Sequence, residues 1–321
     1  MKAPKVLISI LNWNAPANTV KTVQSLLLSD YKDYSILLLD NNSTDNSEMI
    51  LKDSFPDCRF IKTKSNLGYA GAHKVAAKLA IKENYDLLWI LNNDVEVFST
   101  SLYALVDGYK RNGDGLFGSV SIKSDGETID FAGGLEIGNN NLIDGNSGYN
   151  ILGGKRIDEV EILEREVSGL QGSSLLIPVN IIIKYGFMNT RFFLYGEETD
   201  YCYCLRSKFN IPSFIIPTSK VLHHGGGSFA QNKKLQWIRI YYSTRNRNLV
   251  HYKYQKDIEI SEMGIKKLPH YCRYFFRHFF LTSKKKKDFD YWTNYYEELG
   301  NLHSFLRIKG KYLDPGKLIK I

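Results

Sequence analysis

The amino-acid sequence predicts an α/β fold, with a mixed and mainly parallel sheet flanked by helices and a helical extension at the C-terminus. Two observations carry this prediction. Short apolar runs alternate with helical patterns through the first two thirds of the chain, which is the order of a doubly wound sheet. Clusters rich in Asn and Asp follow these runs, where parallel strands present groups to ligands. We therefore expect two domains, residues 1–230 with the sheet and residues 231–321 as a basic and aromatic helical extension.

The first three strands are expected at Lys5–Leu11, Ser35–Leu39 and Arg59–Lys62, which are short apolar runs rich in strand-forming residues. A helical pattern over Pro16–Leu28 follows the first strand, and Pro is favoured in the first turn of a helix. Another helix is expected over Ala72–Glu83, after the third strand. The polar clusters after these strands are Trp13-Asn14, Asp40-Asn41-Asn42-Ser43-Thr44-Asp45 and Asn66-Leu67-Gly68-Tyr69-Ala70-Gly71.

The fourth strand, Leu87–Leu91, is a continuous apolar run and is expected to be buried on both faces of the sheet. It ends at Asn92-Asn93-Asp94. Taken alone, this tripeptide is more typical of a turn than of a site. Hard divalent cations prefer oxygen ligands, however, and Asp94 and the Asn92 side chain offer them. Right-handed crossovers bring the four polar clusters to one edge of the sheet, which favours a binding site there.

Neither a dinucleotide fingerprint nor a GxxxxGK[ST] phosphate loop occurs in the sequence. A nucleotide would therefore be held by side chains at the strand ends, with Asn14 and Asp40 at the ribose and base, and by a metal on its diphosphate. The Gly- and Asn-rich middle, residues 113–166, is expected to form strands and loops suited to acceptor binding. An insertion without function is an equally good interpretation. A strand over Ser173–Val179 and a short helix over Asn180–Tyr185 follow.

A second dense cluster occurs in Phe192–Arg206, where aromatic residues lead into Glu197-Glu198-Thr199-Asp200 and a helix that continues to about Phe209. Carboxylates in the first turn stabilise a helix by roughly 0.3–1 kcal/mol through its macrodipole, which explains one or two of them. Three carboxylates in four positions exceed that need. A carboxylate held at a helix N-terminus stays ionised at neutral pH, as a general base must.

Two histidines, His223 and His224, end a predicted strand over Ser213–Leu222 and precede three glycines. A single histidine is more often structural, but this pair before a glycine loop suggests a ligand for a metal or a diphosphate. A helix follows over Ile238–Tyr252. Its Arg245 offers a forked contact to phosphate oxygens, and a solvated basic face is the alternative.

Positive charge is concentrated in the C-terminal part of the chain. From residue 231 onward there are 20 Lys and Arg against 8 Asp and Glu, a formal charge of +12, whereas residues 1–230 carry 22 against 26, or −4. Aromatic residues alternate with these cations in Pro269–Tyr296, a pattern typical of surfaces that bind anionic membranes. A helical core with a solvated edge explains the pattern nearly as well, and binding of single-stranded nucleic acid explains it less well.

The remaining composition is that of a globular protein, with 43% hydrophobic and 24% charged residues. No apolar run approaches the ~20 residues that span a bilayer. The N-terminal apolar stretch is too short for a signal peptide and is expected to be the first strand. The four cysteines show no framework spacing, which favours free thiols in a reducing cytoplasm.

In their order along the chain, these clusters resemble the inverting family-two glycosyltransferases of the Rossmann-like GT-A fold, and most closely their rhamnosyltransferase-like bacterial branch. The resemblance covers about residues 5–250 and rests on seven motifs in the order of the family. It is highly specific for the family and weakly specific for the sugar. Besides the strand-end and acidic clusters, the motifs include His223 with its glycines and Ser228, and Tyr242 with Arg245-Asn246.

The resemblance implies a role for each matching position. It assigns nucleotide-sugar binding to Trp13, Asn14, Asp40, Asn42, Asn66, Gly68, Asn92, Asn93 and Arg245. Asp94, the last residue of the DxD-type motif, and His223 would bind Mg²⁺ or Mn²⁺ on the diphosphate. Glu198 falls at the position of the catalytic base.

Two departures from the family pattern affect these roles. The first position of the metal motif is Asn92, so that metal binding would depend on Asp94, His223 and water. The base position holds Glu198 where the family has Asp. The extra methylene group leaves Glu197 and Asp200 as alternative bases.

The function that the resemblance implies is transfer of a sugar, with rhamnose among the candidates, from a dTDP- or UDP-linked donor to a glycan or lipid-linked glycan of the cell envelope. The expected location is the cytoplasm, peripherally at the inner face of the membrane, with no nucleic-acid partner. A sugar nucleotidyltransferase is less consistent, because the segment LNWNAPANT lacks the glycine-rich and basic loop of those enzymes. A non-catalytic glycan-binding module is also less consistent, because it does not explain Asp94 and the acidic cluster Glu197–Asp200.

Overall fold

The computed structural model describes residues 3–134, 150–225, 233–254, 269–276 and 289–318. The chain divides into two compact units. The first, here called the sheet unit, comprises Met1–Thr190 and Glu197–Gln231, and the second, the helical unit, comprises Arg191–Gly196 and Asn232–Ile321. The short segment 191–196 therefore belongs to the helical unit, although the sequence assigned every residue up to 230 to one domain.

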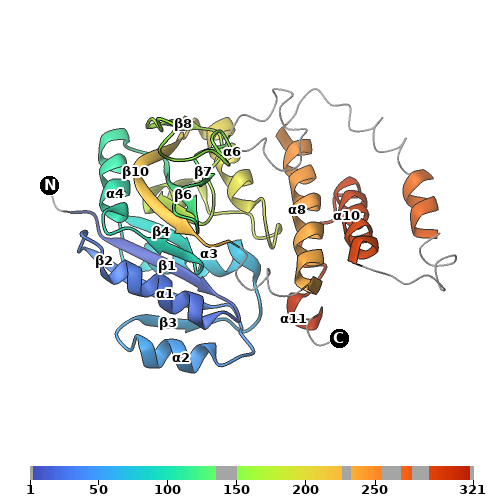
Figure 1. Ribbon diagram of the computed structural model, residues 1–321, viewed down its shortest axis with the longest axis horizontal. Helices are drawn as coiled ribbons and strands as arrows, with labels where there is room; N and C mark the ends of the chain where they lie inside the picture. Colours follow the sequence, from blue (N-terminus) through green and yellow to red (C-terminus); the bar gives the residue numbers. More distant parts are fainter. Residues whose placement is uncertain (1–2, 135–149, 226–232, 255–268, 277–288, 319–321) are drawn as a thin grey trace. The chain divides into compact units, whose positions relative to one another are not determined.

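The sheet unit contains, among the described residues, a ten-stranded mixed sheet (Figure 1). Its strand order is β3-β2-β1-β4-β9-β6-β10-β5, with β7 paired to β6 and β8 paired to β10. The β3-β2-β1-β4 part is parallel, and antiparallel pairs, such as β4 with β9, occur beyond it. The strands are β1 (Val6–Asn12), β2 (Tyr34–Asp40), β3 (Arg59–Lys62), β4 (Leu87–Asn92), β5 (Val95–Val97), β6 (Leu116–Lys123), β7 (Ile129–Phe131), β8 (Arg165–Val167), β9 (Ser174–Pro178) and β10 (Ser213–His223).

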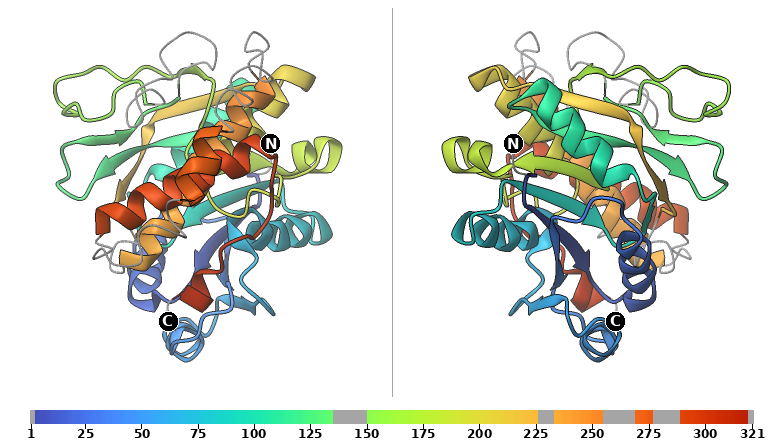
Figure 2. Two further views of the ribbon diagram at one scale, coloured as in Figure 1. Left: turned by 90° about the vertical axis from the view of Figure 1, so that its right-hand side faces the viewer. Right: turned by 90° about the vertical axis from the view of Figure 1, so that its left-hand side faces the viewer.

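Helices cover both faces of this sheet, as the two views of Figure 2 show. One apolar cluster joins the sheet to α1, α2 and α4, and another joins its opposite face to α3, α5 and α6. Every side chain of Leu87–Leu91 in β4 is fully buried, and each contributes roughly 1.5–3 kcal/mol relative to an exposed position. The helices are α1 (Pro16–Leu27), α2 (Ser47–Ser54), α3 (Gly68–Lys82), α4 (Ser101–Asn112), α5 (Val179–Tyr185) and α6 (Glu197–Phe209).

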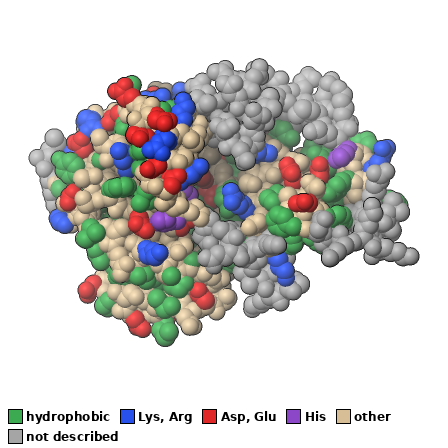
Figure 3. All heavy atoms as spheres, viewed as in Figure 1, with side chains coloured by type: hydrophobic (Ala, Val, Ile, Leu, Met, Phe, Trp, Pro, Cys, Tyr) green, Lys and Arg blue, Asp and Glu red, His purple; other side chains and the backbone are tan. Residues whose placement is uncertain are grey.

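Charged side chains of both signs gather on the sheet unit near β8 (Figure 3). Arg156 pairs with Glu127 at 2.5 Å and with Asp158 at 3.1 Å, and Arg111 pairs with Glu164 at 2.5 Å. Exposed pairs of this kind contribute about 0–1 kcal/mol each. Each of these two arginines is therefore already paired with at least one carboxylate.

The helical unit is built around α8 (Lys233–Tyr254) and α10 (Phe289–Phe305), which pack against each other, with α11 (Pro315–Leu318) beside α8. Gly300 permits the close approach of the two long helices, because a Cβ atom there would lie 2.8 Å from the carbonyl oxygen of Tyr241. Trp237 stacks on Phe289 and Tyr296, with ring centroids 5.7 and 6.0 Å apart. Part of the predicted basic-aromatic surface is thus a packed helical core.

Some predicted features fall outside the described residues. These are the stretch 135–149 of the Gly- and Asn-rich middle, the lysine run 284–287, and Ser228 with the last two glycines after His224. Among the described residues, no helix has both the length and the apolar character needed to cross a bilayer.

Candidate active site

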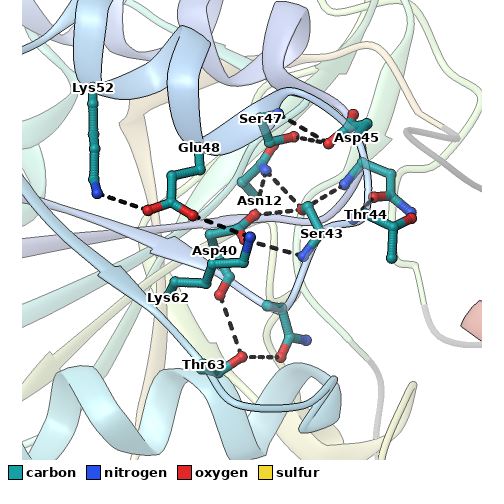
Figure 4. Close-up of polar contacts among 12 residues, drawn as sticks. Asn12, Asp40, Ser43, Thr44, Asp45, Ser47, Glu48, Lys52, Lys62 and Thr63 are labelled. Carbon is teal, nitrogen blue, oxygen red and sulfur yellow. Dashed lines mark hydrogen bonds and ion pairs between the residues drawn. The ribbon is translucent and has the colours of Figure 1, made fainter.

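Strands β1 and β2 end in a polar network that joins Asn12, Asp40 and Ser43 (Figure 4). Asn12 lies opposite Asp40 in the parallel register and donates from Nδ2 to Oδ1 of Asp40 at 2.9 Å. Ser43 donates its backbone N–H to Oδ2 of Asp40 at 3.0 Å and its hydroxyl to Oδ1. Asn12 and Asp40 are both fully buried. Asp40, predicted at the nucleoside, therefore holds the loop that follows β2.

The loops after β1 and β2 are joined by Asn14. Its backbone N–H donates to Oγ of Ser43 at 2.9 Å, and its Oδ1 accepts the N–H of Thr44 at 2.8 Å. Asn14 and Asn42 have positive φ angles of 51° and 64°, which Asn tolerates better than most residues. The partly exposed Trp13 lies in the first of these loops. Three of the residues predicted to bind the nucleotide-sugar, Trp13, Asn14 and Asn42, thus lie in two loops that are fixed to each other.

The start of α3 is tied to the same sheet edge by Asn41 and Asn66. Nδ2 of Asn41 donates to Oδ1 of Asn66 at 3.0 Å, and Oδ1 of Asn41 accepts the N–H of Leu67 at 2.8 Å. Asn66 also accepts the N–H of Gly68 at 2.9 Å. Gly68 has a φ of 73°, which glycine adopts without steric cost. Asn66 and Gly68, predicted beside the nucleotide-sugar, therefore adjoin the loop after β2.

The turn after β4 carries Asn92, Asn93 and Asp94. The side chain of Asn93 donates to the carbonyl oxygen of Ala15 at 3.3 Å and to Oγ1 of Thr19 at 3.0 Å, which fixes the turn against the start of α1. Asn92 is partly exposed, whereas Asp94 is buried, with 8% of its surface accessible. Asn93 thus has a structural role, and Asn92 and Asp94 lie at the end of the strand, as predicted.

Asp94 lies beside His223 at the end of β10. Its Oδ1 is 3.5 Å from Nε2 of His223, and Oδ2 of Asp130, in β7, is 2.8 Å from Nδ1. Burial alone would lower the pKa of His223, but the hydrogen bonds and charges of Asp130 and Asp94 raise it to about 9. Burial would likewise raise the pKa of Asp130, and its contact with His223 lowers it instead. The imidazole is therefore held between two carboxylates.

Asp130 was not predicted as a site residue. Nε2 of Gln171 lies 3.5 Å from Oδ2 of Asp130, while Oε1 of Gln171 accepts the hydroxyl groups of Ser121 at 3.1 Å and Ser173 at 2.9 Å. These hydroxyl groups fix the orientation of the amide, so that its N–H side faces the carboxylate. The one signal in the sequence is a carboxylate between the apolar residues Ile129 and Phe131.

At neutral pH the raised pKa leaves a proton on Nε2 of His223, and a divalent cation bound by Asp94 and His223 would take the place of that proton. A histidine that binds a metal commonly donates its other ring N–H to a carboxylate, and Asp130 stands in that relation to Nδ1 of His223. Among the described residues, no group of three or more His, Cys, Asp or Glu forms a metal site. Asp94 and His223 would supply two of the ligands, and diphosphate oxygens and water would supply others, as is usual for Mg²⁺.

Helix α6 begins with Glu197 and Asp200, both buried, and with Glu198, which is partly exposed. Nearby, the hydroxyl of Tyr69 donates to the carbonyl oxygen of Gly172 at 2.5 Å. Burial, with the charges of Glu198 and Glu197, raises the pKa of Tyr69. Burial also raises the pKa of Glu198, and the backbone N–H groups of Glu198 and Gly172 only partly oppose it. The helix N-terminus thus has a smaller effect on Glu198 than the sequence predicted.

Arg245, predicted to contact phosphate, is fully buried in α8 of the helical unit. Its Nη1 donates to the carbonyl oxygen of Gly310, its Nη2 to that of Phe192 and its Nε to Oδ1 of Asn246, each at 2.8 Å. Hydrogen bonds to the protein therefore engage all three nitrogens. These bonds give Arg245 a structural role in the helical unit, and its phosphate contact stays a prediction from the sequence.

Comparisons with known proteins agree on one family. The family model described as Glycosyl transferase family 2 matches residues 7–158. The N-acetylglucosaminyl-diphospho-decaprenol L-rhamnosyltransferase of Mycobacterium tuberculosis (strain CDC 1551 / Oshkosh) is 30% identical over an alignment of 219 residues, and the match covers 62% of this chain and 69% of that protein.

Two solved structures share the fold. The mannosyltransferase PcManGT from Pyrobaculum calidifontis, in complex with GDP-Man and Mn²⁺, has a TM-score of 0.54 and 11% identity, covering 96% of this chain and 88% of its own. GalNAc-T7 with UDP, GalNAc and Mn²⁺ has a TM-score of 0.53 and 15% identity, covering 88% of this chain and 58% of its own. At these identities the likeness concerns the fold alone. The predicted GT-A fold is thereby confirmed.

Proposed function

Because the chain belongs to glycosyl transferase family 2 and is a glycosyltransferase, we propose that it transfers a sugar from a dTDP- or UDP-linked donor to a hydroxyl of a lipid-linked glycan precursor, with inversion. Rhamnose is the first sugar to test, since the M. tuberculosis relative is a rhamnosyltransferase. The observation that carries the proposal is buried Asp94 beside His223, at the sheet edge that also carries the loops after β1 and β2.

On the donor side, Trp13 and Asn14 contact the nucleoside from the loop that Asp40 and Ser43 hold in place. Asp94 and His223 would hold Mg²⁺ or Mn²⁺ for the diphosphate, and Asp130 orients the imidazole. When bound, the cation supplies positive charge against the negative charge that develops on the departing diphosphate. Asn92, partly exposed beside Asp94, is a weaker contact to the same group.

On the acceptor side, Glu198 removes the proton of the acceptor hydroxyl as that oxygen attacks the anomeric carbon. Burial raises the pKa of Glu198, and a carboxylate with a raised pKa is a stronger base. Glu197 and Asp200 are the alternatives. Both are more deeply buried than Glu198, and an acceptor reaches them less easily. A single displacement inverts the anomeric centre and needs no covalent enzyme intermediate.

The helical unit supports a peripheral location at the cytoplasmic face of a membrane. Residues 231–321 carry a formal charge of +12, and charges of this sign are attracted to anionic lipids. Phe276, Leu306 and Tyr312 in this unit are more than half exposed. Such apolar side chains beside cations are typical of proteins that bind at a membrane interface.

The test is hydrolysis of a panel of nucleotide-sugars with Mg²⁺, with Mn²⁺ and with EDTA, followed by transfer to a lipid-linked acceptor. We expect turnover of a dTDP- or UDP-linked sugar that EDTA abolishes. NMR of the product should show the anomeric configuration opposite to that of the donor. A product that retains the donor configuration contradicts the mechanism, and full turnover in EDTA contradicts the metal role.

A further inference from the structure

The helical unit contains a pocket that the proposed mechanism does not use. Arg191, Arg307, Lys309 and Gly310 line it, and its volume is about 640 Å³, within the range of roughly 300–1,000 Å³ typical of small-ligand sites. Three of its four lining residues are cations with exposed side chains. Among the ion pairs of the described residues, none involves Arg307 or Lys309. The pocket therefore concentrates positive charge.

Arg307 occupies a position where its side chain carries a conformational cost. Helix α10 ends with the N–H of Arg307 bonded to the carbonyl of Ser304 at 3.1 Å and the N–H of Ile308 bonded to that of His303 at 2.9 Å. This is the Schellman arrangement, in which the residue at the left-handed position is usually Gly. Arg307 has a φ of 57° there, at a cost of roughly 1–2 kcal/mol relative to the right-handed conformation. Helix termination alone therefore favours Gly at this position. An arginine side chain that is kept there despite the conformational cost suggests a function for its guanidinium.

The guanidinium of Arg307 stacks on the ring of Tyr252 in α8, 5.0 Å from its centroid. Stacking covers one face of the guanidinium and leaves its N–H edge available for a planar, forked contact. This is the geometry in which arginine binds phosphate oxygens.

The pocket is held in shape by the buried pair Arg245 and Asn246. Arg245 bonds at once to the carbonyl oxygens of Phe192 and Gly310, and Asn246 donates to those of Phe192, Leu194 and Tyr195 at 2.7–2.9 Å. The N–H of Gly310 donates to the carbonyl oxygen of Arg191 at 2.6 Å. The segments that carry the pocket cations, Arg191 on one side and Arg307 with Lys309 on the other, are therefore fixed to each other.

From these contacts we propose that the pocket formed by Arg191, Arg307 and Lys309 is a phosphate-binding site, and that its ligand is the diphosphate of the lipid-linked acceptor. The phosphate site follows from the pocket itself, whereas the identity of the ligand rests on the proposed function. Three cations favour a diphosphate over the single negative charge of a phospholipid headgroup. The headgroup shares the phosphate chemistry and is the other source that the experiment must distinguish.

The first experiment measures binding of inorganic pyrophosphate to the full chain by titration calorimetry in EDTA, where no metal-dependent donor binding contributes. We expect Arg307→Gly and Lys309→Gln each to raise the Kd about tenfold, the loss expected for one charge-assisted hydrogen bond. Arg239→Ala removes an exposed cation of α8 in the same unit and should leave the Kd unchanged. Arg307→Gly places the favoured residue at the left-handed position, so the variant should stay folded and weaker binding cannot be ascribed to unfolding.

The second experiment compares farnesyl diphosphate with phosphatidylcholine vesicles that contain or lack phosphatidylglycerol. Weaker binding of farnesyl diphosphate to Arg307→Gly, with donor hydrolysis unchanged, supports the acceptor diphosphate. Weaker binding to the anionic vesicles alone assigns the site to headgroups and overturns the acceptor ligand. Equal pyrophosphate affinity in wild type, Arg307→Gly and Lys309→Gln overturns the site. Loss of the proposed function would instead appear as absent donor turnover by the wild type, with pyrophosphate binding intact.

Discussion

Replacement of Arg245 by Lys distinguishes a structural guanidinium from a phosphate ligand. Lys keeps the charge but has a single nitrogen, which cannot bond to the carbonyl oxygens of Phe192 and Gly310 together. A buried carbonyl left without its partner costs about 1–3 kcal/mol. The loss of a planar cation near the rings of Tyr241 and Tyr242, at 5.4 and 4.8 Å, costs about 0.5–1 kcal/mol more. We expect the free energy of unfolding of the helical unit to fall by roughly 1.5–4 kcal/mol.

Urea unfolding, followed by circular dichroism, measures this change. Hydrogen exchange in the segments 191–196 and 308–313 reports directly on the bonds from Arg245 to Phe192 and Gly310. Local opening of these segments exposes backbone amides that are otherwise protected. The matched control is Arg247→Lys, which alters an exposed arginine of the same helix and should change stability by less than about 0.5 kcal/mol. Wild-type stability and exchange in Arg245→Lys, together with weaker binding of nucleotide-sugar, would refute the structural role and restore the phosphate contact predicted from the sequence.

Three further predictions concern the sheet unit. Asp94→Asn should abolish transfer and the thermal stabilisation by nucleoside diphosphate with Mn²⁺, whereas Asn92→Ala should weaken transfer about tenfold; equal loss in both variants would contradict the unequal roles. Glu198→Gln should reduce kcat roughly 100-fold or more and remove the acidic limb of the pH–rate profile, while Asp200→Asn should retain turnover; the reverse outcome would make Asp200 the base. Burial lowers the pKa of His73 to about 3, so below pH 6.5 the unfolded chain binds a proton that the folded chain excludes. Stability should therefore decrease as the pH falls from 6.5 toward 3, by roughly 2 kcal/mol at pH 5, and the slope should be smaller in His73→Asn; equal slopes in urea unfolding would exclude this origin.

The sheet could be predicted because its signals are local. The apolar run Leu87–Leu91 and the adjoining polar tripeptide depend only on the immediate sequence, and β4 extends over Leu87–Asn92. The third strand, Arg59–Lys62, was predicted with the bounds that the structure gives. The parallel register then brings Asn12 opposite Asp40, as expected for polar residues at the ends of neighbouring parallel strands.

The partner of His223 could not be predicted because the signal is not local. Asp130 lies 93 residues before His223 in a three-residue strand, too short to show a period. Only the pairing of β7 with β6, and of β6 with β10, brings the two side chains together. The pKa of Glu198 could not be predicted either, because it depends on burial. Burial raises this pKa, and a sequence alone shows the helix N-terminus but not the apolar surroundings.

The arginines of the helical unit show why residue type alone does not predict a phosphate ligand. Arg245 was assigned to phosphate by resemblance, yet it is buried and all three of its nitrogens bond to the protein. Arg307 was not predicted as a site residue, yet it is exposed at a pocket and occupies a position that favours Gly. The two cases make opposite predictions, since removal of the Arg245 fork should cost stability and leave donor binding intact, whereas Arg307→Gly should preserve stability and weaken phosphate binding. Stability and binding should therefore both be measured for each variant, because the two arginines are expected to differ in each measurement and in opposite directions.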